Sequence, residues 1–434
     1  MNICTAGLRA VTLLVLALPA SGQEMSKNPD YVSREEYEAL KKELDAMKTR
    51  LAELEGKTVT ESKTQEQIDT LGRELEAVKS LAEGSGLGET KMLIAGDTEV
   101  GFTDLHNDHS SFNAEFSPMF LIELNDRLLF QGDLDIELNG PDENGENSET
   151  DVELGAAFLS YLINDYSLVG MGLFPVPFTA YHNHFDPGWI NKLPTDPLIY
   201  GDNGIAPDSA VGVFVTGAFE RGISQFNYAA YITNGPALIT EDPDSAGSFN
   251  FDDYNDTNNN KAVGGRIGYL PIPELEVGYS FQFSDPSPSG FETLHSHLHG
   301  IDWNYVASLD SIKGRLTARG AWVWSQLTTA TYVLDTAPPR SVRFGNNRNG
   351  GYGELAYRPT ETEDEILRNF EFVLRYDQLN VPSDAPGGGD RQMWTPGIDY
   401  WITPRTVLKT SYQFDDSENG EGDNGFFVQL ATGF

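Results

Sequence analysis

The chain has almost no cysteine. Cys4 is the only cysteine among its 434 residues, and it lies in an amino-terminal segment that we expect to be removed on export. The mature chain should therefore contain no thiol at all, which excludes thiolate catalysis, disulfide bonds and zinc sites built from cysteine. This composition suits an exported protein that is stabilised by other means.

Basic residues are also scarce. The chain has 29 Lys and Arg residues against 66 Asp and Glu residues, giving a formal net charge of −37. A protein that binds nucleic acid needs a basic surface, so nucleic acid is excluded as a partner. Much of the acidic surplus lies in three polar segments, which we interpret as solvated loops: 139–150, 240–244 and 414–424.

Long apolar runs are missing after the first few residues. The first nine residues contain one basic residue, Arg9, and they are followed by the apolar run 10–18 and then by mostly small residues up to Gly22. This pattern predicts a secretory signal peptide over residues 1–22, and a buried amino-terminal helix is the alternative. No later run is long enough for a membrane-spanning helix. If the protein lies in a membrane, it crosses it as strands.

Residues 23–90 are expected to be helical. Apolar residues recur there at alternate spacings of three and four, which is the coiled-coil pattern: Tyr37, Leu40, Leu44, Met47, Leu51 and Leu54. A Gly/Ser-rich linker, 84–88, ends the segment. We predict a short periplasmic coiled coil that joins several protomers, with a lone amphipathic helix as the alternative. Three protomers would suit a porin, but these apolar residues do not decide between two and three protomers.

From residue 91 on, the chain has the alternation of strands. Leu134 and Ile136 alternate with Asp133, Asp135 and Glu137, and carboxylates at every second position point to a wet interior rather than to lipid. The chain ends in the same pattern and stops on an aromatic residue. We predict sixteen strands near 91–102, 111–124, 127–138, 151–163, 166–178, 208–220, 224–234, 261–270, 275–284, 294–307, 312–326, 350–358, 368–380, 391–402, 405–414 and 425–434.

The connections between these strands alternate in length. Every second connection is a short turn, whereas the others are longer and polar, notably 179–207, 235–260 and 327–349. Short turns at one rim and long loops at the other are typical of outer-membrane barrels. The predicted fold class is a transmembrane all-β protein, in which residues 91–434 form a closed antiparallel barrel of about sixteen strands behind an α-helical coiled coil.

Three strand ends resemble those of a known group. They are the segment Gly170–Phe178, the segment Tyr231–Gly235 and the terminal Phe434. They are similar to strand ends of bacterial outer-membrane porins of the phosphate-selective O/P family and of related siderophore-type porins with an amino-terminal coiled coil. The resemblance implies a pore, and it implies that the final Phe belongs to an assembly signal. Phosphate-selective members carry a dense array of basic residues, for which this acidic chain has no obvious equivalent.

Two sets of residues are candidates for the pore. By the alternation, inward-facing charges form an acidic and a basic wall, and such walls orient polar solutes; they are Asp133, Asp135, Glu137, Arg266, Arg315, Arg319, Arg375 and Lys409. The segment 179–207 is too apolar for a free loop, so we predict that it folds into the pore as the constriction. Packing on a neighbouring subunit or over the rim is the alternative. Its candidate residues are Phe185, Trp189, Lys192, Asp196 and Tyr200.

Histidines lie in close groups, which raises the question of a metal site. His295, His297 and His299 share a strand face and could bind a transition metal. They also share that face with Ile301 and Trp303, so we expect them to point outward as polar residues at the membrane interface. We predict no metal site, no cofactor and no catalytic residue, because no nucleophile–base pair stands out.

The sequence therefore predicts an outer-membrane porin that lets small hydrophilic solutes or ions diffuse passively. Its expected partners are outer-membrane lipid, the solutes themselves and two further copies in a homotrimer. The alternatives are a selective channel for siderophore or metal chelates or anions, and a structural or tethering barrel. The sequence does not name the solute.

Overall fold

The computed structural model describes residues 91–106, 109–141, 148–201, 204–251, 256, 258–336, 339–418, 422 and 424–434. Sixteen long strands lie in this part of the chain. They are β1 (Lys91–Leu105), β2 (Ser111–Asn125), β3 (Leu128–Pro141), β4 (Ser148–Asn164), β5 (Ser167–Pro175), β6 (Ser209–Arg221), β7 (Ser224–Thr233), β10 (Ala262–Ile272), β11 (Leu275–Ser284), β12 (Ser296–Leu309), β13 (Gly314–Thr336), β14 (Pro339–Arg358), β15 (Phe370–Val381), β16 (Gly389–Thr403), β17 (Thr406–Ser417) and β18 (Gly425–Gly433).

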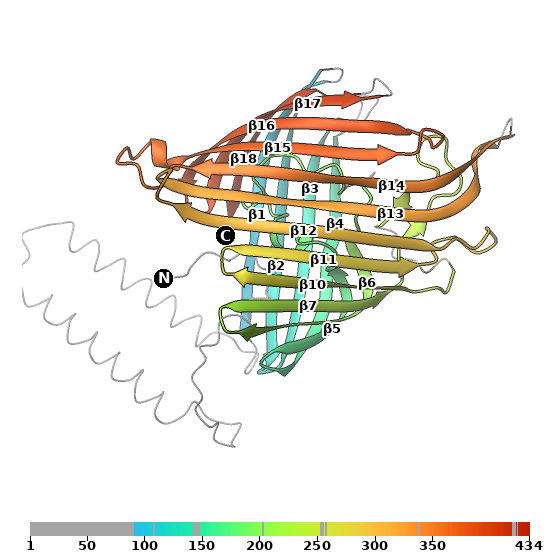
Figure 1. The fold of residues 1–434 in the computed structure, drawn as a ribbon, viewed down its shortest axis with the longest axis horizontal. Coiled ribbons are helices and arrows are strands. Elements are labelled where there is room, and N and C mark those ends of the chain that lie inside the picture. Colours follow the sequence, from blue (N-terminus) through green and yellow to red (C-terminus); the bar gives the residue numbers. More distant parts are fainter. Residues whose placement is uncertain are drawn as a thin grey trace, which may run out of the picture. The chain divides into compact units, whose positions relative to one another are not determined.

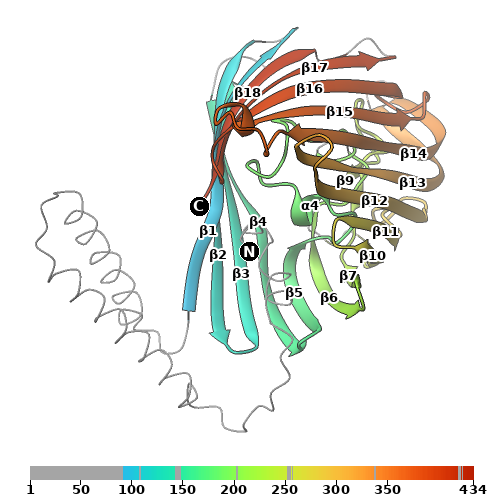
Figure 2. The ribbon, with the colours of Figure 1, turned by 60° about the vertical axis from the view of Figure 1, so that its left-hand side comes forward.

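These strands form one closed barrel (Figures 1 and 2). Each strand pairs antiparallel with the next long strand in the chain. Between β7 and β10, which also pair, the connection forms a separate small sheet of β8 (Ala237–Leu238) and β9 (Phe249–Asn250). The last strand closes the ring against the first, from Asp97 opposite Gly433 to Leu105 opposite Gly425. Closure leaves no open edge, which a barrel in hydrocarbon requires. The predicted sixteen-stranded barrel is confirmed.

The alternation of side chains sets the inside and the outside of the barrel. On β15, Phe372 and Leu374 are exposed on the outer wall, whereas Glu371 and Arg375 are buried on the inner side. The terminal strand does the same, and Phe434 ends the chain 44% exposed on the outer wall. An apolar outer wall around a polar interior is the pattern of barrels that face lipid. None of the described helices is both long and apolar enough to cross a bilayer.

One predicted loop is wrong. Residues 327–349 are not a loop, because β13 and β14 continue as a paired hairpin as far as Thr336 opposite Pro339. On its inner side Tyr332 and Phe344 stack with ring centroids 4.6 Å apart. They belong to a buried cluster with Phe249 and Leu238 of the preceding long connection. Partners that are remote in sequence stabilise this hairpin, so its own residues give little sign of it.

The predicted signal peptide, residues 1–22, and the predicted coiled coil with its linker, residues 23–90, lie outside the described residues.

Candidate functional site

A long connection lies inside the barrel. We call residues 176–208, between β5 and β6, the inner loop; its described part includes the short helix α4 (Tyr181–His184). The loop contacts inward-facing groups on well-separated strands. The Thr179 amide donates to Ser280 Oγ on β11 at 3.0 Å, and the Gly188 amide donates to Asp97 Oδ2 on β1 at 3.1 Å. These contacts place the predicted constriction segment, 179–207, within the lumen rather than over the rim.

Aromatic packing fixes the shape of the inner loop. Tyr181 and Tyr200 stack with centroids 4.4 Å apart and an interplanar angle of 12°, and both rings lie edge-on to Tyr352 of β14. Thr179 has a φ of 59°, a strained value for a β-branched residue. Its hydroxyl lies 2.7 Å from the Tyr200 hydroxyl, a buried hydrogen bond that holds this conformation.

Arg375 anchors the loop to β15. Its guanidinium donates to the Thr195 carbonyl at 2.6 Å, to Thr195 Oγ1 at 3.1 Å and to the Asp196 carbonyl at 2.9 Å. Its Nε donates to Asp377 Oδ2 at 2.8 Å, and both side chains are fully buried. The predicted pore residue Arg375 therefore points inward, but the inner loop covers it and Asp377 neutralises its charge.

Arg319 has the same role on β13. Its Nε donates to Glu354 Oε1 at 2.6 Å, and its Nη2 donates to Asn191 Oδ1 of the loop at 3.4 Å. The guanidinium also lies over the Phe185 ring, 4.7 Å from the centroid. Because the guanidinium lies between a carboxylate and an aromatic ring, it attracts anionic solutes only weakly.

Two lysines tie the other side of the loop to the wall. Lys409 of β17 donates to the Gly188 carbonyl and, at 2.7 Å, to Gln429 Oε1. Lys192 of the loop donates to both Glu371 oxygens, at 2.9 and 3.0 Å, and lies 5.3 Å from the Trp401 ring centroid. Four of the predicted charged residues therefore hold the loop: Lys192, Arg319, Arg375 and Lys409.

Glycines on the wall allow the loop to approach closely. A Cβ on Gly397 would meet Leu193 Cδ2 at 2.5 Å, and a Cβ on Gly433 would meet Trp189 Nε1 at 2.5 Å. Leu193 is fully buried in a cluster with Ala356 and Val373. Both glycines provide space for an apolar side chain of the inner loop, and nothing in their local sequence shows this.

The loop also holds a buried histidine, His182, between two carboxylates. His182 Nδ1 lies 3.5 Å from Asp186 Oδ1 and 3.3 Å from Asp208 Oδ1. Burial lowers the pKa of His182, but these two carboxylates outweigh it and raise the pKa from 6.5 to about 9. Asp196 accepts a hydrogen bond from the Tyr181 hydroxyl at 2.6 Å and one from Asn191 Nδ2 at 3.1 Å. The predicted residue Asp196 thus braces the loop.

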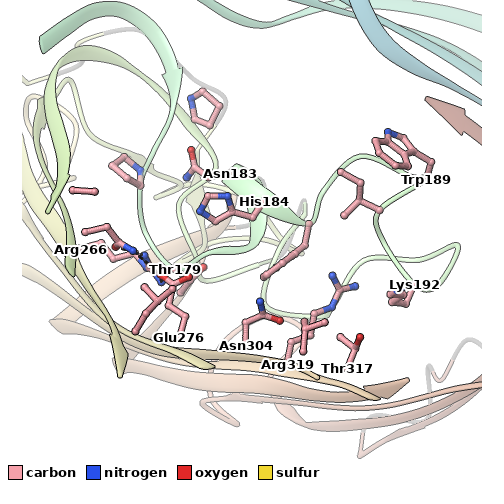
Figure 3. Close-up of a pocket in the computed structure, with 18 of the residues that line it drawn as sticks. Thr179, Asn183, His184, Trp189, Lys192, Arg266, Glu276, Asn304, Thr317 and Arg319 are labelled. Atoms are coloured by element: carbon pink, nitrogen blue, oxygen red, sulfur yellow. Dashed lines mark hydrogen bonds and ion pairs between the residues drawn. The ribbon is translucent and has the colours of Figure 1, made fainter. Parts of the chain in front are cut away.

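A cavity of about 780 Å³ lies next to the loop (Figure 3). Its lining includes Thr403 and Pro404, so the cavity reaches the rim with the short turns. Figure 3 shows Arg266, Glu276, Asn304, Arg319 and Thr317 along the barrel wall, with Asn183, His184, Trp189 and Lys192 of the loop on the other side.

Arg266 is a compensated cation in this wall. Its guanidinium donates to the two Asp302 oxygens at 3.1 and 2.6 Å, to Glu276 Oε1 at 2.9 Å and to Asn227 Oδ1 at 3.1 Å. Two carboxylates therefore surround one predicted pore-lining arginine.

Arg315 differs from the other predicted cations because it is exposed in the lumen. Its partner across the sheet is Arg358 of β14. Among the described residues neither arginine forms an ion pair with a carboxylate. Arg358 donates to the Arg368 carbonyl at 2.9 Å and lies 5.2 Å from the Trp401 ring centroid. Glu371, which accepts hydrogen bonds from Lys192, also attracts Arg358, so the two arginines keep a net positive charge in the cavity lining but are not wholly uncompensated.

The predicted acidic residues lie on the inner face of β3. Gln131 Nε2 donates to Asp133 Oδ2 at 3.0 Å, Asp135 approaches the backbone of Gly155, and Glu137 lies opposite Glu115 of β2. Sequence reasoning missed Glu115, although β2 has the same alternation. It also missed the carboxylates that pair with the basic residues: Asp302, Glu354, Glu371 and Asp377. All but Asp377 lie on a different element from their partner, so these pairings depend on the tertiary structure.

The histidines of β12 lie as expected. His297 and His299 contact Phe283 of the outer wall, with ring centroids 5.2 and 6.0 Å apart, and the His299 ring is 2.8 Å from the Tyr279 hydroxyl. His295 pairs with Asp285 at 2.7 Å. In the described part of the chain, no group of three or more His, Cys, Asp or Glu residues could hold a metal ion.

Comparison with solved structures shows the porin fold. The chain is similar to OmpF of Salmonella typhi, solved in complex with daunomycin, with a TM-score of 0.50 at 14% identity over 80% of this chain and 98% of that one. The anion-selective porin of Comamonas acidovorans has a TM-score of 0.47 at 14% identity, covering 80% and 100% of the two chains. The channel DcaP of Acinetobacter baumannii has a TM-score of 0.48 at 12% identity, covering 80% and 99%. No protein-family model matches the chain, and no curated protein matches it.

Proposed function

We propose that this protein is an outer-membrane porin through which small hydrophilic solutes diffuse passively. The observation that carries the proposal is a loop folded into the lumen of a closed sixteen-stranded barrel and anchored there by buried ion pairs. An anchored loop narrows a water-filled barrel without closing it, and this arrangement selects solutes by size. Passive diffusion needs no cofactor and no catalytic residue.

The orientation and assembly of the protein belong to the same proposal. Both ends of the barrel chain lie at the rim with the short turns, which we assign to the periplasm. An amino-terminal signal peptide and a periplasmic coiled coil would then precede the barrel on that side. We further propose a homotrimer that is held together by the coiled coil and the barrel walls. Cross-linking in native membranes tests this, since a single species of monomer mass would contradict it.

Ion preference follows from the charges that remain after pairing. Arg266, Arg319 and Arg375 are neutralised by neighbouring carboxylates, so they contribute little to the field in the pore. Arg315 forms no ion pair with a described carboxylate, and Glu371, the carboxylate that attracts Arg358, is already bonded to Lys192. The net positive charge that remains on these two arginines raises the concentration of anions at the short-turn rim. We expect Arg315 to set the anion preference more strongly than the buried arginines do.

Reconstitution in planar bilayers tests the proposal. A porin gives stepwise ohmic conductance, and the double variant Arg315→Gln/Arg358→Gln should shift the reversal potential in a KCl gradient toward cations. Replacing the exposed Arg343 of β14, which bonds Thr331 at 3.2 Å, should leave the reversal potential unchanged. Silence at high protein dose would favour a structural barrel, and release of a lipid product without conductance would favour an enzyme. Either result would refute the proposal.

A further inference from the structure

Gly188 anchors the inner loop at the seam of the barrel, where β18 closes the ring against β1 (Figure 2). Its amide donates to Asp97 Oδ2 on β1 at 3.1 Å, and its carbonyl accepts a hydrogen bond from Lys409 Nζ on β17. Lys409 also donates to Gln429 of β18, the strand between these two. A Cβ on Gly188 would meet Glu99 Oε1 at 1.2 Å, so a side chain at this position would prevent such a close approach to the wall.

Asp399 of β16 is a buried carboxylate beside this anchor. It lies directly opposite Lys409 in the register of β16 and β17, and it is only 1% exposed. Within the described residues, neither Asp399 oxygen accepts a hydrogen bond, from Lys409 or from any other group. A buried carboxylate without a partner costs free energy, and Lys409 attracts it more strongly than Lys192 does. Lys409 therefore has a second acceptor next to the one that it uses.

We propose that Asp399 is a positioning residue for the inner loop: it competes with the Gly188 carbonyl for the Lys409 ammonium, and the partner that Lys409 takes sets how far the loop narrows the pore. The inference rests on the proposed pore function and adds a means by which the width of that pore changes. With Lys409 on Gly188, the loop is docked on the seam. With Lys409 on Asp399, Gly188 keeps only its bond to Asp97, and this part of the loop moves away from the wall.

The side chains around Lys409 favour this exchange of partners. Its ammonium is carried on a flexible four-carbon stem, so it can turn toward Asp399 without movement of β17. Glu371 of β15 lies opposite Asp399, but it is not a rival acceptor. It already accepts hydrogen bonds from Lys192 and from Trp401 Nε1, at 2.9 and 2.8 Å. Because Lys192 is bonded to Glu371, Lys409 is the cation that can pair with Asp399.

Different contributions favour the two positions of Lys409. A hydrogen bond from an ammonium to a carboxylate is stronger than one to a neutral carbonyl, which favours Asp399. Docking of the loop favours Gly188, because Trp189 packs against Gly433 of β18 when the loop lies on the seam. Since these contributions oppose each other, the charge of Asp399 shifts the loop toward its undocked position.

Hydrogen exchange and single-channel recording of the full chain test the proposal. Asp399→Asn removes the charge and nearly keeps the shape, so the amides of residues 186–190 should exchange about tenfold more slowly. Its channels should also switch less often between current levels. Lys409→Gln should speed the same exchange about tenfold and increase the open-channel current. Adding Asp399→Asn to Lys409→Gln should change neither quantity further, because no lysine is left to attract.

Unchanged or faster exchange in Asp399→Asn would overturn the proposal. Equal slowing by Asp399→Asn with and without Lys409 would also overturn it, because that result indicates general relief of a buried charge. If Lys409→Gln does not fold, Asp399→Asn still decides, since loss of a merely structural contact speeds exchange instead of slowing it. Conducting channels with unaltered exchange in Asp399→Asn would refute this role alone, whereas a protein that does not conduct would refute the porin function itself.

Discussion

Arg375 offers the sharpest test of how the inner loop is held. Replacing it with Ala removes three hydrogen bonds to the loop and leaves Asp377 buried, with only the 3.3 Å bond from the Leu198 amide. Removing one partner of a buried ion pair costs about 3–5 kcal/mol. The barrel ladder does not depend on this side chain, so the cost falls on docking of the loop. It corresponds to a factor of about 10² to 10⁴ in the docking equilibrium.

Hydrogen exchange with mass spectrometry measures that equilibrium directly. Amides of residues 190–200 should exchange at least about a hundredfold faster in Arg375→Ala, because exchange follows local opening. The open-channel current should also become larger and noisier. Arg375→Lys, which keeps the charge but loses the planar fork, should be intermediate. Arg315→Ala serves as the control and should leave the exchange unchanged. Unaltered exchange and conductance in Arg375→Ala would refute the anchoring role.

Three further predictions concern the loop and the barrel seam. Leu193→Ala should destabilise the docked loop by about 2–5 kcal/mol, because Leu193 is fully buried, and differential scanning calorimetry should show a lower unfolding temperature. His182 has a pKa raised from 6.5 to about 9, so the stability that it contributes is complete below about pH 6.5 and is lost as pH rises through 9. Loop exchange, corrected for its intrinsic pH dependence, should therefore rise between pH 7 and 10, and His182→Asn should abolish that rise. Deleting Phe434 removes the hydrogen bond from its amide to the Gly96 carbonyl at 2.9 Å and its stacking on Phe116, with centroids 5.9 Å apart. In SDS gels, the mobility shift that marks heat unfolding should therefore appear at a lower temperature than in Phe414→Ala. Phe414→Ala is the control, because it also removes a ring from the outer wall. An equal shift in the two variants would contradict a special role of the seam.

The barrel itself was predictable because strand alternation is a local property. On β15, Glu371 and Arg375 are buried whereas Phe372 and Leu374 are exposed, and the sequence shows this as polar and apolar residues at alternate positions. Turn residues likewise indicated where most strands end. The β13–β14 hairpin is the exception, because its pairing depends on residues about eighty positions earlier in the chain, such as Phe249.

The candidate site was predictable only in part. The sequence placed Arg315, Arg319 and Arg375 on the inner face, but it did not distinguish the exposed one from the two that anchor the loop. That distinction depends on which carboxylates lie opposite. Glu354 meets Arg319 because of the register between β13 and β14, and Asp377 meets Arg375 two residues along the same strand.

The sequence by itself determined the number of strands, the inner and outer faces and the loop that is too apolar to be free, because each follows from residues close together in the chain. Only the tertiary structure decided which charges stay available to a solute. Closure of the barrel brings β1, β13, β15 and β17 around one loop. The electrostatic compensation of each arginine depends on the distance to the carboxylates that strand register and folding place beside it.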